Sequence, residues 1–213
     1  MSEIFVGLDL GQSSDYTALV AVEMVEQEEA DRPLYHLRHL QRFDLGTPYT
    51  TIVSQVDRLF TNLAFDKKWL VVDTTGVGAP VVDLLKQVEL TPIPVLITGG
   101  TTVNHEDGTF RVPKRDLVGI LQSLFQTGRL KIAQGLPEVQ KFVDELLDFQ
   151  VKISTATGRD TYGAWREGTH DDMVLAAAIA CWFGNYARER KRSPFENDFF
   201  ARHERQSDSF WKW

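Results

Sequence analysis

Phe5-Val-Gly-Leu-Asp9-Leu-Gly11 is an apolar stretch that delivers one carboxylate, and its pattern predicts a strand over residues 4–10. The stretch Leu70-Val-Val-Asp73 repeats this arrangement further along the chain. Thr169-His-Asp171-Asp172 then predicts a helix start with two acids in its first turn. Carboxylates from two strands and a helix can converge on one point and bind a pair of divalent cations, the arrangement that catalyses in-line cleavage of phosphodiesters. The sequence therefore predicts a two-metal site built from aspartates.

The order of the predicted elements indicates an α/β fold. Strands over 4–10, 16–24 and 35–43 form an antiparallel meander, and helices over 49–63, 79–88, 113–127 and 136–147 follow, with short strands at 69–73 and 93–97 between them. Residues 98–108 are expected to form a polar loop, residues 149–153 and 161–165 a hairpin, and residues 170–186 a buried helix. Pro92 and Pro94 indicate an exposed edge or the start of a strand. Right-handed crossovers place the 69–73 strand beside the first strand, which brings Asp9 and Asp73 together at the carboxyl edge of the sheet.

The composition fits a globular protein with one main domain. The 213 residues are 43% hydrophobic, which is enough for a proper core. No apolar run approaches the roughly 20 residues that span a bilayer, and the first residues lack the pattern of a secretory signal. Cys181 is the single cysteine, so an intramolecular disulfide is impossible. The absence of disulfides fits a reducing cytoplasm. We expect a cytoplasmic protein with a domain over 1–187 and a basic, aromatic tail over 188–213.

The aspartate pair before the last predicted helix, together with a second stretch, resembles a known family. His170-Asp171-Asp172-Met-Val-Leu-Ala-Ala, together with Val112-Pro113-Lys114-Arg115 at the start of an earlier helix, resembles the C-terminal nuclease domain of the phage large terminase subunit. The resemblance covers residues 3–187. It implies a ribonuclease H-like α/β fold, in which a mixed sheet of a three-strand antiparallel meander plus parallel strands is flanked by helices. It also implies an Mg²⁺- or Mn²⁺-dependent endonuclease that cuts double-stranded DNA during viral genome packaging.

The resemblance also implies partners. A complete large terminase carries an ATPase, but the chain has no Gly-x-x-x-x-Gly-Lys-[Ser/Thr] motif, so we expect no ATP hydrolysis by that route. A terminase ATPase domain, the portal and the small terminase subunit are candidate partners beside double-stranded DNA. The net charge of −7 is uneven: residues 186–213 carry seven basic and five acidic groups, and the remainder 16 basic and 25 acidic. The excess of acidic groups before residue 186 predicts weak, salt-sensitive DNA binding.

Each candidate metal ligand also has a simpler interpretation. Asp9 is expected to bridge both cations, since a buried carboxylate needs a partner. Asp73 is expected to be a ligand, or else the N-cap of the next helix. Asp171 is favoured as the principal ligand of its pair, with Asp172 as a second ligand or as part of a capping arrangement with Thr169. Asp15 would support the metal site or simply belong to a turn.

A further set of side chains could position DNA phosphates, although each also fits an ordinary surface charge. The set comprises Arg111, Lys114, Arg115, Lys152, Arg159, Arg166 and His170. Gly7 and Gly11 would allow backbone, metal and phosphate to approach closely. The aromatic residues of the tail are interpreted either as a docking segment or as part of a flexible tail.

The sequence is also compatible with three other functions. A Holliday-junction resolvase has the same fold and would prefer branched DNA. A packaging scaffold without activity would lack metal binding. Gly7-Leu-Asp-Leu-Gly11 also resembles the first phosphate loop of actin-like ATPases and sugar kinases, which ATP binding would reveal.

Overall fold

The computed structural model describes residues 3–11, 15–27, 31–76, 78–154, 159–164 and 171–192, with the backbone alone for 148–154 and 159–164. The main sheet contains β1 (Glu3–Asp9), β2 (Ala18–Val25), β3 (Leu34–Arg42), β4 (Lys67–Asp73), β5 (Pro92–Thr98), β6 (Asn104–Glu106), β7 (Thr109–Pro113) and β8 (Leu130–Ile132). Their order across the sheet is β6-β7-β5-β4-β1-β2-β3-β8. β9 (Phe149–Ser154) and β10 (Arg159–Ala164) form a separate antiparallel hairpin, as predicted.

The sheet is mixed, as the order of elements predicted. β1, β2 and β3 form the antiparallel meander, while β4 runs parallel to β1, and β5 and β7 continue the parallel half. β1 is therefore central, and all of its residues are buried because helices cover both faces of the sheet. α1 connects β3 to β4, which lies on the other side of β1 from β2 and β3.

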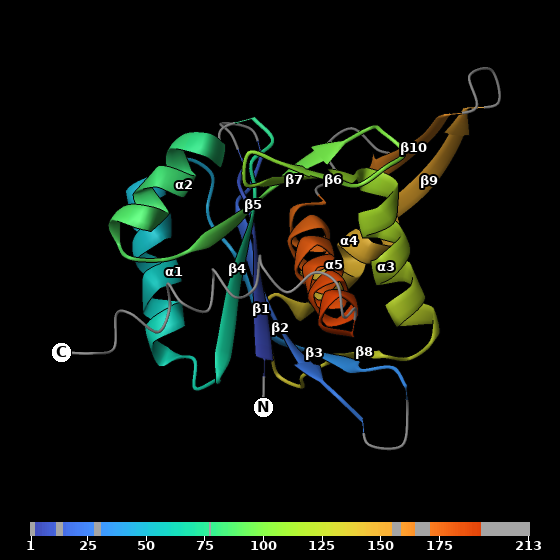
Figure 1. Ribbon diagram of the computed structural model, residues 1–213, viewed down its shortest axis with the longest axis horizontal. Coiled ribbons are helices and arrows are strands. Elements are labelled where there is room, and N and C mark those ends of the chain that lie inside the picture. Colours follow the sequence, from blue (N-terminus) through green and yellow to red (C-terminus); the bar gives the residue numbers. More distant parts are fainter. Residues whose placement is uncertain are drawn as a thin grey trace.

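Helices pack on both faces of the sheet, giving three layers (Figure 1). α1 (Tyr49–Asn62) and α2 (Gly78–Gln87) cover one face, and α3 (Lys114–Gln126), α4 (Val139–Asp148) and α5 (Asp172–Arg192) lie on the other. Two apolar cores result: Val6, Leu8 and Val72 face α1 and α2, whereas Phe5 and Val71 face α5. Within the described ranges, no helix is both long and apolar enough to cross a membrane.

The region expected to be a polar loop contains structure. Residues 104–106 pair with β7 as a short hairpin, and β7 leads directly into α3. β5 is not an edge strand, because β7 pairs with it from Val95 onward. Its prolines are tolerated since Pro92 opens the strand and Pro94 precedes the β7 pairing. β8, which the sequence did not predict, pairs in parallel with β3.

The last helix extends further than the sequence predicted. α5 continues to Arg192, six residues beyond the expected end at Tyr186. Arg188 is buried, and its guanidinium donates to Oε1 of Glu26 at 2.7 Å and to the carbonyl of Asp31 at 2.6 Å. These bonds tie the end of α5 to the β2–β3 connection. The tail from residue 193 onward lies outside the described residues.

Candidate active site

Strand geometry places the two strand aspartates at the same point. β1 and β4 are parallel with Leu8 level with Val72, so the next residues, Asp9 and Asp73, end the two strands side by side. Side chains alternate along a strand, and Asp9 therefore shares its face with Phe5, on the side of α5. Both carboxylates consequently point toward the layer that contains α5, at the carboxyl edge of the sheet.

Gly7 allows α5 to approach this edge. A Cβ at Gly7 would overlap the carbonyl oxygen of Ala176, so the α5 backbone packs directly on β1. This close packing brings the start of α5, with Asp171 and Asp172, to Asp9. Gly11 is required by a different contact, because a Cβ there would overlap backbone oxygens of Asp15 and Tyr16 in the following turn. Both glycines permit close backbone packing within the protein.

The resulting cluster is buried and electrostatically crowded. Asp9, Asp73 and Asp172 are exposed by only 8%, 6% and 6%. Burial raises the pKa of Asp9 well above its usual value, and the charges of Asp73, Asp172 and Asp171 raise it further. Burial also raises the pKa of Asp73, whereas hydrogen bonds from Thr75 and from the Asp9 carboxyl oppose that rise.

Asp73 is also fixed by a local turn. Its Oδ1 accepts hydrogen bonds from the amide and the hydroxyl of Thr75, at 2.8 and 2.6 Å. The Thr75 hydroxyl oxygen in turn accepts from the amide of Ile97 on β5. These contacts orient Asp73 by an Asx turn, while α2 begins only at Gly78.

Lys114 brings a positive charge to the cluster. Its ammonium donates to Oδ2 of Asp171 at 3.0 Å, and its charge lowers the pKa values of Asp9 and Asp73 against the effect of burial. β7 explains this position, because it runs parallel to β5 and ends at the same sheet edge as β1 and β4. Lys114 is the first residue of α3, directly after that edge.

Glu145 contacts the start of α5, and sequence reasoning did not single it out. This buried α4 side chain accepts hydrogen bonds through Oε2 from the amides of Met173 and Val174, at 3.0 and 3.2 Å, in the first turn of α5. Its other oxygen forms an ion pair with Arg42. Nothing in the spacing of the sequence marks this contact, since Glu145 lies 28 residues before Met173.

The fold is similar to that of known structures, although no family model and no curated protein sequence matches the chain. The match to the large terminase nuclease from thermophilic phage G20c spans 84% of this chain and 81% of that structure, with 20% identity and a TM-score of 0.60. The Mn-soaked human cytomegalovirus terminase nuclease domain covers 85% and 82%, with 14% identity and a TM-score of 0.54. The bacteriophage SPP1 large terminase nuclease domain with bound Mn covers 88% and 86%, with 13% identity and a TM-score of 0.53.

The chain has the fold of terminase nuclease domains. This ribonuclease H-like architecture confirms the fold class expected from the order of the elements. In this fold the acidic cluster lies where the central parallel strands end, the usual ligand-binding edge of an open α/β sheet.

The donor atoms of the cluster are of the type that divalent cations bind. Carboxylate oxygens are the ligands that Mg²⁺ and Mn²⁺ prefer, and burial of several like charges is relieved by a cation. As the side chains lie, however, no three acidic, histidine or cysteine residues in the described part of the chain are close enough to hold one ion. Three of these residues could hold one ion only if their side chains moved closer together.

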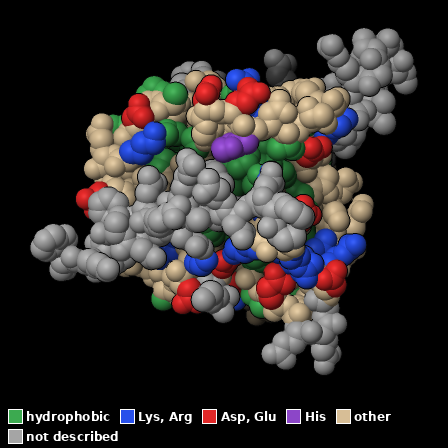
Figure 2. Space-filling model, in the orientation of Figure 1, with side chains coloured by type: hydrophobic (Ala, Val, Ile, Leu, Met, Phe, Trp, Pro, Cys, Tyr) green, Lys and Arg blue, Asp and Glu red, His purple; other side chains and the backbone are tan. Residues whose placement is uncertain are grey.

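The remaining candidates are exposed, contact other partners or lie outside the described side chains. Asp15 is exposed in the turn after β1. Arg111 pairs with Glu106 across the β6–β7 hairpin at 3.6 Å, and Arg115 donates to the carbonyl of Thr101 at 2.8 Å. The side chains of Lys152, Arg159, Arg166 and His170 are outside the described set, as is Thr169. On the face shown in Figure 2, acidic and basic side chains are interspersed.

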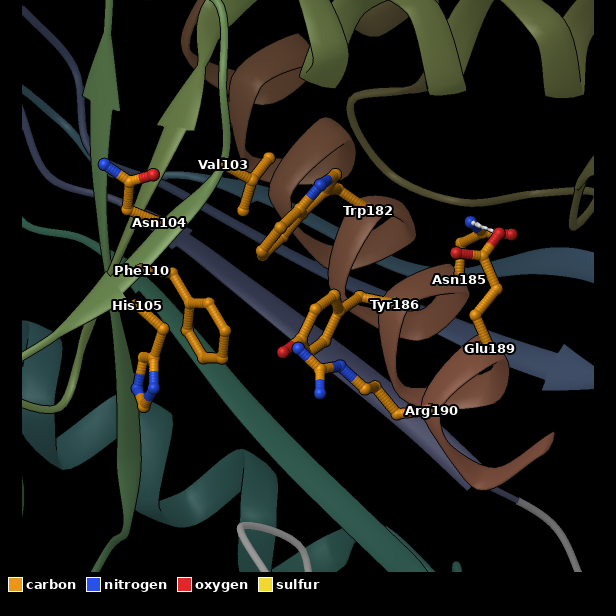
Figure 3. A pocket seen from close by; sticks show the side chains of 9 residues that line it. All are labelled: Val103, Asn104, His105, Phe110, Trp182, Asn185, Tyr186, Glu189 and Arg190. Carbon is orange, nitrogen blue, oxygen red and sulfur yellow. Dashed lines mark hydrogen bonds between the residues drawn. The ribbon is translucent and has the colours of Figure 1, made fainter. Parts of the chain in front are cut away.

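A hollow of about 310 Å³ lies away from the acidic cluster, between the β6–β7 hairpin and the second half of α5 (Figure 3). Its lining residues are Val103, Asn104, His105, Phe110, Trp182, Asn185, Tyr186, Glu189 and Arg190. Trp182 follows Asp172 by ten residues, or about 15 Å along the helix. The hollow is therefore separate from the candidate active site.

Proposed function

We propose that the chain is a metal-dependent endonuclease that cuts double-stranded DNA during viral genome packaging. The observation that carries this proposal is the convergence of Asp9, Asp73 and Asp172, all buried, at the carboxyl edge of a terminase-type sheet. A buried group of carboxylates is unfavourable unless a cation compensates it. The Mn²⁺ in two of the similar nuclease structures is consistent with that cation being Mg²⁺ or Mn²⁺.

Four aspartates would hold the cations. Asp9 is the central member because the charges of the other three all act on it. Asp73 approaches from β4, and Asp171 and Asp172 approach from α5. When bound, two divalent cations would supply an activated water and stabilise the leaving oxygen of the phosphodiester. Asp15 remains a candidate supporting ligand from the neighbouring turn.

The protein's own groups have three tasks at this site. The buried strand ends fix Asp9 and Asp73 in a low-dielectric position, where charge interactions are strong. Lys114, which pairs with Asp171, would balance the carboxylates and contact a DNA phosphate. Additional phosphate contacts are proposed for Arg111, Arg115, Lys152, Arg159, Arg166 and His170.

The packaging role is proposed from the likeness to terminase nuclease domains. The expected partners are a terminase ATPase domain, the portal and the small terminase subunit. These partners would deliver DNA to a domain whose net charge of −7 disfavours DNA binding by itself.

Cleavage of supercoiled plasmid with Mg²⁺, Mn²⁺ or EDTA tests the proposal. We expect metal-dependent nicking and linearisation, reduced at least a hundredfold in Asp9→Asn. The matched control is Asp83→Asn, which makes the same chemical change on α2 in the opposite layer, where the side chain is exposed. Equal cleavage by both variants would show that the activity does not use this cluster. Preference for a four-way junction over linear duplex would favour a resolvase instead.

A further inference from the structure

The first turn of α5 is capped in an unusual way. Asp171 immediately precedes the first helical residue, Asp172, and so occupies the N-cap position. An aspartate at this position normally accepts hydrogen bonds from the second or third amide of its own helix. Those amides belong to Met173 and Val174, and here both donate to Oε2 of Glu145 from α4. Glu145 thus performs the capping that Asp171 would ordinarily perform.

Because Glu145 caps the helix, the Asp171 carboxylate is available to the acidic cluster. Its Oδ2 accepts from the ammonium of Lys114 at 3.0 Å. Its charge acts on Asp9 together with that of Asp172. The Asp171 backbone still makes a helical hydrogen bond, because its carbonyl accepts from the amide of Leu175 at 2.8 Å. The helix start is therefore stabilised without using the side chain that faces the site.

Glu145 is itself held in place. Its carboxylate is only 6% exposed, and Arg42, at the end of β3, forms an ion pair with Oε1. The Arg42 guanidinium also lies over the ring of Tyr16 at 4.8 Å, next to the turn that follows β1. A buried carboxylate without such a partner would be strongly destabilising. The Arg42–Glu145 pair thus connects β3, α4 and the start of α5.

We propose that Glu145 is a positioning residue, which caps α5 in place of Asp171 and so frees the Asp171 carboxylate to face Asp9 beside Asp172, with Arg42 fixing the orientation of Glu145. The benefit to metal binding rests on the proposed function, whereas the capping itself does not. Two experiments separate these two parts.

The first experiment measures Mn²⁺ affinity by calorimetry without DNA. We expect Glu145→Ala to weaken binding by about tenfold or more, as is usual when support for metal ligands is lost. Glu145→Gln keeps an oxygen that can accept from Met173 and Val174, and should stay within about threefold of the wild type. Equal loss in both variants, or no loss in either, overturns the proposal. Leu85→Ala, in the opposite core, controls for stability: it should lower Tm without changing Mn²⁺ affinity.

The second experiment is a double-mutant cycle on thermal unfolding in EDTA, and it holds even for a chain that binds no metal. In the wild type, Asp171→Ala removes no cap but does remove the ion pair with Lys114, so Tm should fall by less than it does in the Glu145→Ala background. In the Glu145→Ala background, Asp171 can turn back to cap its own helix, so the same change should lower Tm by about 2–4 °C. Additive effects of the two substitutions would show that Glu145 does not replace Asp171 as the cap. A wild type that binds no Mn²⁺ would instead refute the metal site of the proposed function.

Discussion

The ammonium of Lys114 lies 3.0 Å from Oδ2 of Asp171, which places a cation of the protein itself beside the acidic cluster. Burial raises the pKa values of Asp9 and Asp73, and the charge of Lys114 opposes that rise. A bound metal ion would have the same effect with a larger charge. Lys114 therefore stabilises the metal-free cluster and competes with a metal for it.

Replacing Lys114 by alanine should strengthen Mn²⁺ binding by about two- to fivefold, because a partly exposed ion pair of this kind contributes about 0.2–1 kcal/mol. Calorimetric titration without DNA measures the change. Arg115→Ala is the matched control: it removes the neighbouring cation, which instead contacts the Thr101 carbonyl and Asp116, and should leave the affinity unchanged. Weaker binding in Lys114→Ala would mean that the lysine organises the carboxylates rather than competing with the ion.

The metal-free protein should lose stability as the pH rises through the raised pKa of Asp9. Burial and three neighbouring acids place that pKa above the usual value of 3.8. The folded state therefore holds the proton more tightly than the unfolded state, so the contribution to stability is largest at low pH and declines as the carboxyl ionises. Asp9→Asn removes the free-energy cost of ionising this buried carboxyl. The variant should therefore raise Tm in EDTA at pH 8 but not at pH 4. A gain of a few degrees is expected, since about 2–4 °C corresponds to 1 kcal/mol. The same Tm difference at both pH values would contradict the assignment.

Addition of Mn²⁺ should reverse the instability at pH 8. An ion that binds only the folded state at 100 times its Kd stabilises that state by about 2.7 kcal/mol. Thermal unfolding with and without EDTA should show this gain in the wild type and in Asp83→Asn, but not in Asp9→Asn or Asp73→Asn. Equal stabilisation of all four proteins would indicate that the ion binds elsewhere.

The sequence predicted the parts of the site that depend on local pattern and strand order. The apolar runs ending at Asp9 and Asp73 defined two strands, and the crossover rule placed those strands side by side. β7 was missed although Phe110 and Val112 alternate with polar residues, because the run is short and directly precedes a stronger helix pattern.

Contacts across long separations gave no signal. The pairing of Arg42 with Glu145 and the capping of α5 depend on how three elements pack together. Gly7 was expected to allow backbone, metal and phosphate to approach closely, and the structure shows that the backbone of α5 packs there. Packing between layers decides such details, and one sequence does not encode them in its periodicity.

The two acids of α5 should differ in their contribution to cleavage. The sequence favoured Asp171 as the principal ligand. Asp172 is only 6% exposed, whereas the Asp171 side chain is 24% exposed and pairs with Lys114. We therefore expect Asp172→Asn to reduce cleavage by at least a hundredfold and Asp171→Asn to reduce it less. Plasmid cleavage at saturating Mn²⁺ makes the comparison, and a larger loss in Asp171→Asn would restore the original preference.

Gly7→Ala should disrupt the site without changing any acid. The added Cβ would overlap the carbonyl of Ala176, so α5 would have to move away from β1 and carry Asp172 away from Asp9. Overpacking of this kind costs about 1–3 kcal/mol and should lower both Tm and Mn²⁺ affinity. Gly119→Ala is the matched control, because a Cβ on that exposed residue of α3 meets no atom within 4 Å and should stabilise the helix by about 0.5–1 kcal/mol. If Gly7→Ala bound Mn²⁺ as tightly as the wild type, close packing of α5 on β1 would not be what assembles the acidic cluster.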